Sequence, residues 1–256
     1  MHNRRVTVPA PRPSATVVLL RDGDAGLELY MQRRAAPIPN GGLWVFPGGR
    51  IDPGDADPAL DASWTGPSPA VWAGRLDATV DEARGAVAAA CRETLEEAGV
   101  LLADRPLAPG RVAAARSALL AGQALGEVLT ALGAGVDTGL LRYWAYWVTP
   151  VGEPRRYATR SFLAALPEGV GVAPHKAEAD QERWLTPAAA AADQAMEMLP
   201  PTRCTVRELA AFPTVAAALA AAVDRPAGPI LPVIEGDDVI LPWGERMPRP
   251  LNRRYT

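Results

Sequence analysis

Three carboxylates lie close together in one short stretch of the sequence, residues 92–100, with the letters RETLEEAGV. At 3.6 residues per turn, Glu96 and Glu97 lie about −60° and about +40° around a helix from Glu93, so all three share one face. Three like charges on one face destabilise a helix that offers them no partner. Oxygen clusters of this kind bind hard divalent cations such as Mg²⁺ or Mn²⁺. The stretch therefore predicts a metal site on an exposed helix face, with a solvated acidic surface as the alternative.

An apolar run at 44–46 (WVF) continues into a Gly- and Pro-rich loop at 47–55 (PGGRIDPGD). The run predicts a short strand, and the loop carries the chain away from it. Gly48 and Gly49 have no side chain, so the backbone there can approach a helix and a bound ion closely. We expect this loop to return to the acidic helix and to complete one site with it.

Together, the loop and the acidic stretch resemble the Nudix box. The family pattern runs Gly, five residues, Glu, seven residues, and then Arg-Glu-apolar-x-Glu-Glu-x-Gly-apolar. The residues that match it are Gly49, Arg92, Glu93, Glu96, Glu97, Gly99 and Val100. Asp55 stands where the family has its first Glu, and 36 residues instead of seven separate it from Arg92.

A box split in this way is similar to that of one branch of the family, the coenzyme A diphosphatases related to peroxisomal acyl-CoA-hydrolysing Nudix proteins. Further stretches that resemble this branch are 29–34, 143–150, 155–157, 184–187, 199–202 and 241–242. Ala158 departs from it, because an acidic residue is expected there. If that acidic residue helps to order the substrate-facing strand, the substrate preference of this chain differs from that of its relatives.

The resemblance implies a role for each charged residue of the acidic helix. Glu93, Glu96 and Glu97 correspond to the family's metal-binding glutamates, with Mg²⁺ or Mn²⁺ as the expected cofactor. Arg92 corresponds to the arginine that orients them, and Arg92 and Glu93 are the expected catalytic residues of the helix. Cleavage of a diphosphate needs an in-line water, a base and a clamp for spread negative charge, and divalent cations supply the clamp.

Three acidic residues that precede Trp184 are the candidates for the general base. Glu178 is the first candidate by its distance from Trp184, Glu182 is the second, and Asp180 lies between them. The alternative is that all three belong to a solvated loop ahead of a strand. His175 lies in the same segment, where a lone histidine is more often incidental than a base.

Arginines near the ends of expected strands could converge on the phosphates of a ligand. These residues are Arg33, Arg34, Arg50, Arg155, Arg156 and Arg160. For each of them the alternative is a role in solubility or in the protection of a sheet edge. The substrate-binding candidates are Arg33, Arg34, Gly48, Gly49, Arg50 and Arg156.

The composition is that of an ordinary soluble globular protein. The chain has 256 residues, of which 48% are hydrophobic and 21% charged, and its net charge is −3. No long basic stripe is present, so we expect a small-molecule nucleotide as the partner and no nucleic acid. No apolar run of about 18 residues predicts a membrane span, and residues 1–5 precede no apolar segment of a secretory signal. Two cysteines give no disulfide framework, which favours the cytoplasm, and a homodimer is left open.

Alternating strand and helix patterns predict an α/β sandwich. The expected elements are a hairpin at 15–31, a strand at 43–46, helices at 81–99 and 111–132, strands at 143–148 and 157–165, helices at 187–196, 205–212 and 214–223, and a last hairpin around 235–237. We therefore expect one Nudix-type α/β/α domain over 1–256 with a mixed sheet, an insertion inside the box at about 56–80, and a C-terminal helical extension at about 199–256.

The insertion contains Trp64 and Trp72 and many Pro and Gly residues. Tryptophan is costly to leave in water, so we expect an ordered, irregular loop that contains one short helix. The insertion should pack beside the active site and shape the pocket for the non-nucleotide half of the substrate. The alternative is that it covers a remote apolar surface or forms a dimer contact.

The resemblance implies a metal-dependent hydrolase of nucleoside diphosphate-linked substrates. The expected substrate is coenzyme A or acyl-CoA, which would give 3′,5′-ADP and (acyl)phosphopantetheine. The same reaction on ADP-ribose or NADH is the nearest alternative. A catalytically silent module that senses a nucleotide is another, and hydrolysis of oxidised triphosphates is a third.

Overall fold

The structure, a computed structural model, describes residues 9–36 and 38–249. The expectation that no secretory signal is present falls partly on residues 1–8, which lie outside the described residues. Within the described ranges, no helix combines the length and the apolar character that crossing a bilayer requires. The compartment and the homodimer stay predictions.

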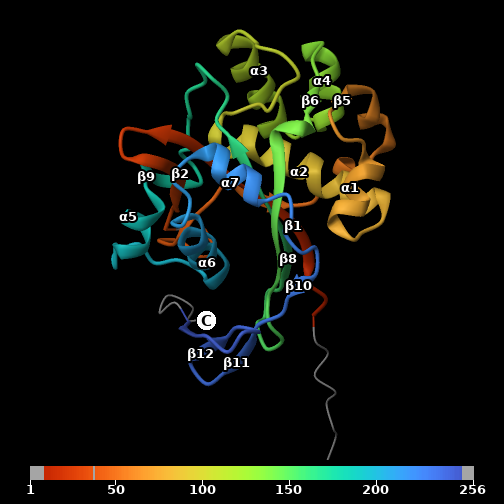
Figure 1. The fold of residues 1–256 in the computed structure, drawn as a ribbon. Coiled ribbons are helices and arrows are strands. Elements are labelled where there is room, and N and C mark those ends of the chain that lie inside the picture. Colours follow the sequence, from red (N-terminus) through yellow and green to blue (C-terminus); the bar gives the residue numbers. More distant parts are fainter. Residues whose placement is uncertain (1–8, 37, 250–256) are drawn as a thin grey trace, which may run out of the picture.

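In the described part of the chain, a mixed sheet of eight strands forms the centre of the fold (Figure 1). Its strands are β1 (Arg12–Gly23), β2 (Gly26–Arg34), β3 (Trp44–Val45), β4 (Gly48–Arg50), β7 (Leu141–Val148), β8 (Tyr157–Ala165), β9 (Ala179–Leu185) and β10 (Pro229–Ile230). The main order is β10-β7-β8-β1-β2-β3, while β4 pairs with β1 and β9 pairs with β2. Because β1–β8 and β7–β10 are parallel and the other pairs antiparallel, the expected α/β fold with a mixed sheet is confirmed.

Strand β1 changes partner along its length. Its residues 20–23 pair with β2 across the expected hairpin, whereas residues 14–16 pair with β4. The end of β2 pairs instead with β3 and β9. The loop after β3 can therefore run beside β1 as β4, which places Gly48 opposite Thr16 and Gly49 opposite Ala15.

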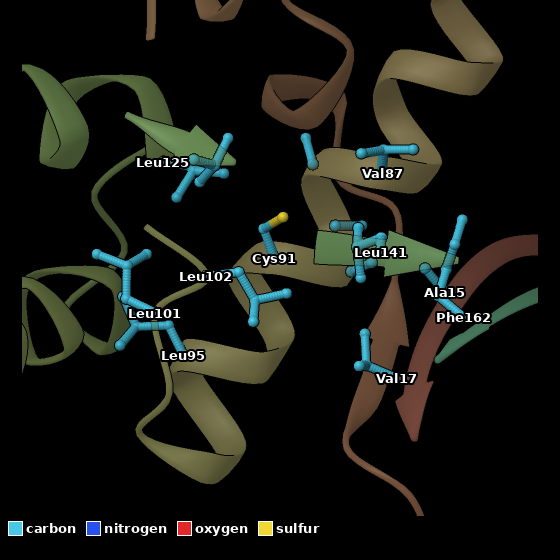
Figure 2. Packing of buried hydrophobic residues seen from close by; sticks show 14 of the residues in the cluster. Ala15, Val17, Val87, Cys91, Leu95, Leu101, Leu102, Leu125, Leu141 and Phe162 are labelled. Carbon is cyan, nitrogen blue, oxygen red and sulfur yellow. The ribbon is translucent and has the colours of Figure 1, made fainter. Parts of the chain in front are cut away.

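Helices cover both faces of the sheet (Figure 1). They are η1 (Pro53–Ala56), η2 (Pro58–Ser63), α1 (Pro69–Leu76), α2 (Val80–Ala98), α3 (Pro109–Leu120), α4 (Leu125–Leu132), η3 (Thr138–Leu140), α5 (Pro187–Ala192), α6 (Pro200–Leu209) and α7 (Val215–Ala221). Helices α1 to α4 bury apolar residues against the face of β1 that carries Ala15 and Val17. Helices α5 to α7 cover the face that carries Val18 and Leu20. Figure 2 shows Cys91 and other side chains of α2 directed into the first cluster.

Helix α2 begins and ends where the sequence predicts, to within one residue. Thr79 is its N-cap and forms a capping box with Glu82, in which Thr79 N donates to Glu82 Oε2 at 2.9 Å and Glu82 N donates to Thr79 Oγ1 at 3.2 Å. Gly99 ends the helix with a φ of 70°, a left-handed conformation that glycine adopts without strain. These caps fix the axial position of the three glutamates.

Two helices are shorter than expected. The single helix expected at 111–132 is α3 and α4, because a turn at 121–124, in which Gly122 has a φ of 91°, separates them. The helix expected at 187–196 ends at Ala192. The side chain of Asp193 accepts a hydrogen bond from Ala195 N at 2.9 Å and pairs with Arg183 at 3.2 Å, which favours a turn at that point.

Up to residue 249, where the described part ends, the expected C-terminal extension is helical only in its first part, α6 and α7. The chain then forms a separate antiparallel sheet of β11 (Val233–Glu235), β12 (Asp238–Ile240) and β13 (Arg246–Pro248). The expected hairpin around 235–237 is present between β11 and β12. β-branched residues in short runs separated by Gly236 and Gly244 suit strands better than a helix.

The insertion packs against the N-terminal half of α2. Trp72 in α1 is fully buried, and its ring meets that of Phe162 edge-on with centroids 5.8 Å apart. Leu60 belongs to the same core, and Arg84 of α2 binds Asp61 at 2.8 Å. The short strands β5 (Trp64–Thr65) and β6 (Val136–Asp137) pair in parallel. The insertion thus covers apolar core surface at the half of α2 that does not carry the three glutamates.

Candidate active site

Arg92 is the centre of a buried ion-pair cluster. Its Nε and Nη2 atoms donate to the two carboxylate oxygens of Asp55, each at 2.9 Å. Nη2 also donates to the carbonyl of Arg50 at 2.8 Å, and Nη1 donates to Glu93 Oε1 and Glu96 Oε2, each at 2.9 Å. A guanidinium has five N–H donors, and these five bonds use all of them. Burial opposes the charge of Arg92, but Asp55 and the two glutamates outweigh burial and raise its pKa.

Asp55 joins the two halves of the split box. Its side chain is 2% exposed, and its Oδ2 also accepts a hydrogen bond from Asp52 N at 2.8 Å. The short helix η1 brings Asp55 to α2 before the chain enters the insertion. An aspartate, shorter than the expected glutamate, therefore reaches Arg92 across a gap of 36 residues.

Glu93 lies directly under the glycine loop. A Cβ atom at position 49 would overlap the Glu93 carboxylate, so any other residue there would displace that carboxylate. Burial raises the pKa of Glu93 to about 7, opposed by the charge of Arg92 and supported by the charge of Glu96. Burial likewise raises the pKa of Glu96, which is the more exposed of the two.

Glu97 faces a different set of partners. Its Oε2 accepts hydrogen bonds from Gln32 Nε2 at 2.6 Å and from Gly48 N at 2.9 Å. Burial raises the pKa of Glu97 far above its usual value, and the negative charge of Glu93 adds to this effect. The expectation of an exposed carboxylate face is therefore wrong, as is the solvated alternative, because Glu93 and Glu97 are only 9% and 4% exposed.

The donor chemistry of the three glutamates fits a hard divalent cation. All the donors are anionic oxygens, and burial and mutual repulsion disfavour their charges, which a cation would relieve. In the described ranges, however, no three Asp, Glu, His or Cys side chains converge as a preformed cation site. Arg92 draws Glu93 and Glu96 together, while Glu97 is held by Gln32. The carboxylates are thus neighbours that would have to turn toward a common ion.

Of the three candidate bases, Glu178 is the one whose charge acts on Glu97, while Glu182 lies opposite Gln32 in the sheet. The loop before β9 docks on the end of α2, where His175 N donates to the Glu97 carbonyl at 3.0 Å, and the Glu178 charge contributes to the raised pKa of Glu97 after burial and Glu93. Glu182 accepts the hydroxyl of Tyr30 at 3.0 Å, and Asp180 is paired with an arginine. His175 Nδ1 is buried without a hydrogen-bond partner, 3.7 Å from Glu178 Oε1.

The candidate arginines separate into two groups. Arg34 lies near the site, since its charge lowers the pKa of Glu97 against the larger effect of burial, and Arg50 holds Arg92 through its carbonyl. Arg33 is bound by Asp180 through two hydrogen bonds of 2.7 and 2.9 Å. Arg156 donates to the carbonyls of Thr149 and Pro9, away from the glutamates, and lines a small hollow of about 70 Å³ with Arg12 and Arg155. Arg160 is buried, with its guanidinium 4.5 Å from the ring centre of Tyr146.

Two residues of the site carry no role in the sequence interpretation. Gln32 holds the Glu97 carboxylate, and Arg116 of α3 donates from Nε to the Glu96 carbonyl at 2.9 Å. The strand period of two could have indicated Gln32, because Tyr30, Gln32 and Arg34 fall on one face of β2 and Arg33 on the other. No comparable signal marks Arg116, whose contact depends on how α3 packs on α2.

Comparison with known proteins places the chain in a family. A profile described as the NUDIX domain matches residues 10–60, which include Gly48, Gly49 and Asp55. A solved NUDIX hydrolase from Alicyclobacillus acidocaldarius is 31% identical, covers 87% of this chain and 100% of its own, and superposes with a TM-score of 0.71.

Two structures of lower similarity are an Ap4A hydrolase from C. elegans and the NUDIX domain of Shewanella oneidensis NrtR complexed with ADP ribose. The first is 16% identical, with 78% of this chain and 96% of that one covered and a TM-score of 0.43. The second is 12% identical, with 81% and 90% covered and a TM-score of 0.42.

Proposed function

The chain belongs to the Nudix hydrolases, pyrophosphohydrolases of nucleoside diphosphate derivatives, and we propose that its substrate is coenzyme A or an acyl thioester of coenzyme A. The observation that supports hydrolase activity is a buried cluster beside Gly49. It consists of Asp55, Arg92, Glu93 and Glu96. The choice of coenzyme A is supported by the resemblance of the split box and of the flanking stretches to that branch. Water attack on the diphosphate would give 3′,5′-ADP and (acyl)phosphopantetheine.

Glu93, Glu96 and Glu97 would hold the divalent cation, Mg²⁺ or Mn²⁺. When bound, such an ion neutralises the diphosphate and lowers the pKa of a bound water. Arg92 keeps Glu93 and Glu96 oriented through its shared Nη1 atom and touches no substrate in this role. Asp55 in turn fixes the guanidinium plane.

Glu178 is our candidate for the residue that accepts a proton from the attacking water at its carboxylate. It is about half exposed and lies beside the end of α2, where its ionisable neighbour His175 is 3.7 Å away. Glu182 is tied to Tyr30, which makes it the weaker candidate. Arg34, Arg50 and the backbone of Gly48 and Gly49 are the substrate-binding candidates that lie near the glutamates. Arg33 and Arg156 are bound elsewhere and are weaker candidates.

The test is a turnover assay of the purified protein with coenzyme A, acyl-CoAs, ADP-ribose and NADH, each with Mg²⁺ or Mn²⁺ and with the products identified by mass. We expect 3′,5′-ADP from coenzyme A substrates at the highest kcat/KM, and no turnover with excess chelator. A higher kcat/KM for ADP-ribose or NADH would identify that compound as the substrate instead of coenzyme A. Nucleotide binding without turnover of any of the four would identify a sensing module.

A further inference from the structure

Gln32 is a buried polar residue at the end of an apolar run in β2. It lies near the end of β2, is 2% exposed, and follows Leu29, Tyr30 and Met31, which are fully buried. Its Nε2 atom donates to Glu97 Oε2 at 2.6 Å, and Gly48 N donates to the same oxygen at 2.9 Å. Both hydrogen bonds that the described residues give to this carboxylate therefore end on Oε2, which leaves Oε1 available.

The other end of the same carboxamide has no partner. Gln32 Oε1 is buried, and no described residue donates a hydrogen bond to it. A buried acceptor without a partner destabilises the folded state, so an apolar side chain of the same shape would be expected at a purely structural position. The amide would avoid this cost if Gln32 Oε1 bound a ligand while Nε2 binds Glu97.

We propose that Gln32 is a positioning residue for the cation site. Its Nε2 atom holds one oxygen of Glu97 so that the other faces the cation, and its Oε1 accepts a hydrogen bond from a donor that arrives with the cation, such as a water molecule on it. This inference rests on the proposed function, because it assigns the cation to Glu97. It adds a residue outside the box, on a strand 65 positions from Glu97, to the residues that control the affinity for the cation.

If Gln32 has this role, its loss should weaken cation binding and should slow the reaction only because less cation is bound. Partners that orient a metal ligand typically contribute about 10- to 100-fold in metal affinity. Gln32→Met keeps the length and volume of the side chain but removes the donor and the acceptor. We expect the Kd for Mn²⁺, titrated on the substrate-free protein and followed by the paramagnetic resonance of free Mn²⁺, to rise about tenfold or more. Excess Mn²⁺ should then restore most of kcat.

The matched control is Gln181→Met, since Gln181 is an exposed glutamine on β9, the strand paired with β2. Its Kd for Mn²⁺ should equal that of the wild type. If Gln32→Met does not fold, Gln32→Asn serves, because it keeps a carboxamide but shortens it by one methylene and so breaks the contact with Glu97.

The outcomes separate the two proposals. A folded Gln32 variant whose Kd for Mn²⁺ stays within about twofold of the wild type overturns the positioning role, even if the enzyme is active. So does a loss of kcat that excess Mn²⁺ does not restore, because that points to packing or to the substrate. Wild-type protein that binds Mn²⁺ but hydrolyses none of the four substrates overturns the proposed function and leaves the role of Gln32 in cation binding standing.

Discussion

Asp55 and Arg92 are 37 positions apart in the chain, yet both carboxylate oxygens of Asp55 accept hydrogen bonds of 2.9 Å from the guanidinium of Arg92. The pair is buried and bidentate, the arrangement in which arginine binds a carboxylate most strongly. Removing Asp55 leaves two buried N–H groups of Arg92 without their acceptors and takes away the arginine's bidentate partner. The same arginine holds Glu93 and Glu96, so the stability of the fold and the orientation of these two carboxylates depend on one side chain.

Asp55→Ala should therefore destabilise the protein by about 3–5 kcal/mol, the usual cost of breaking a buried ion pair. Urea unfolding followed by tryptophan fluorescence measures this change. The control is Glu235→Ala, which removes one partner of the exposed pair with Arg246 and should cost less than about 1 kcal/mol. Equal and small losses in the two variants would show that the Asp55–Arg92 pair does not stabilise the folded state.

Glu97→Gln should reduce kcat by several orders of magnitude while the protein stays folded. The substitution removes a metal-binding charge and keeps the shape, and the amide oxygen can still accept from Gln32 and Gly48. Because burial disfavours the charge of Glu97, the metal-free variant should unfold at the wild-type temperature or above it. Thermal unfolding with and without Mn²⁺ and a turnover assay test this. If the variant keeps more than about a tenth of wild-type kcat at saturating metal, Glu97 does not bind the cation.

The metal-free protein should lose stability through Glu93 as the pH rises. Burial raises the pKa of Glu93 to about 7 from an ordinary value of 4.5, so the folded state binds this proton more tightly than the unfolded state does. The contribution is fully present below 4.5 and is lost as the pH approaches 7.

The test is therefore to measure the free energy of unfolding of the wild type and of Glu93→Gln in chelator. Between pH 4.5 and pH 7, the wild type should lose stability relative to the variant. The titrating carboxylate is absent from the variant, so effects common to both proteins cancel. A difference that does not change with pH would contradict the prediction.

Trp72→Ala should destabilise the protein by about 3–5 kcal/mol, because it removes a fully buried side chain that packs on Phe162. The tryptophan lies in the insertion and packs beside the N-terminal half of α2, so the Kd for Mn²⁺ of the folded variant should stay at the wild-type value. Urea unfolding and Mn²⁺ titration measure the two quantities. A large loss of Mn²⁺ affinity with little loss of stability would show that the insertion contributes to the active site.

The local signals in the sequence predict the elements that position the site. The hairpin of β1 and β2, the strand before the glycine loop and both ends of α2 follow from turn residues, caps and periodicity, all of which act over a few residues. The break at Gly122 and the end of α5 at Asp193 were missed, because an apolar or alanine-rich run looks helical until a turn or a tertiary ion pair interrupts it. After α7, the hairpin of β11 and β12 was expected, whereas β10 and β13 were missed because they are short.

The sequence predicts those parts of the site that depend on residue type and spacing. It does not predict the parts that depend on how distant elements pack. The carboxylates, Arg92 and the glycines are recognisable by spacing, and the structure brings them together. The burial of Glu97 depends on β2 and the loop before β9, which lie far from α2 in the sequence. For the same reason the sequence could not separate Arg34, which is near Glu97, from Arg156, which is bound to Pro9.

The position of the insertion has a consequence for how such proteins are found. Closing a loop of 36 residues instead of seven costs only about 1.4 kcal/mol more, because closure entropy grows with the logarithm of length. The bond between Asp55 and Arg92 can offset a cost of that size, so natural variation can lengthen this gap with little penalty. A search pattern with fixed spacing would overlook the chain. A pattern that allows any number of residues between the acidic residue and the arginine would find this chain. It would also find other chains whose insertions differ in length.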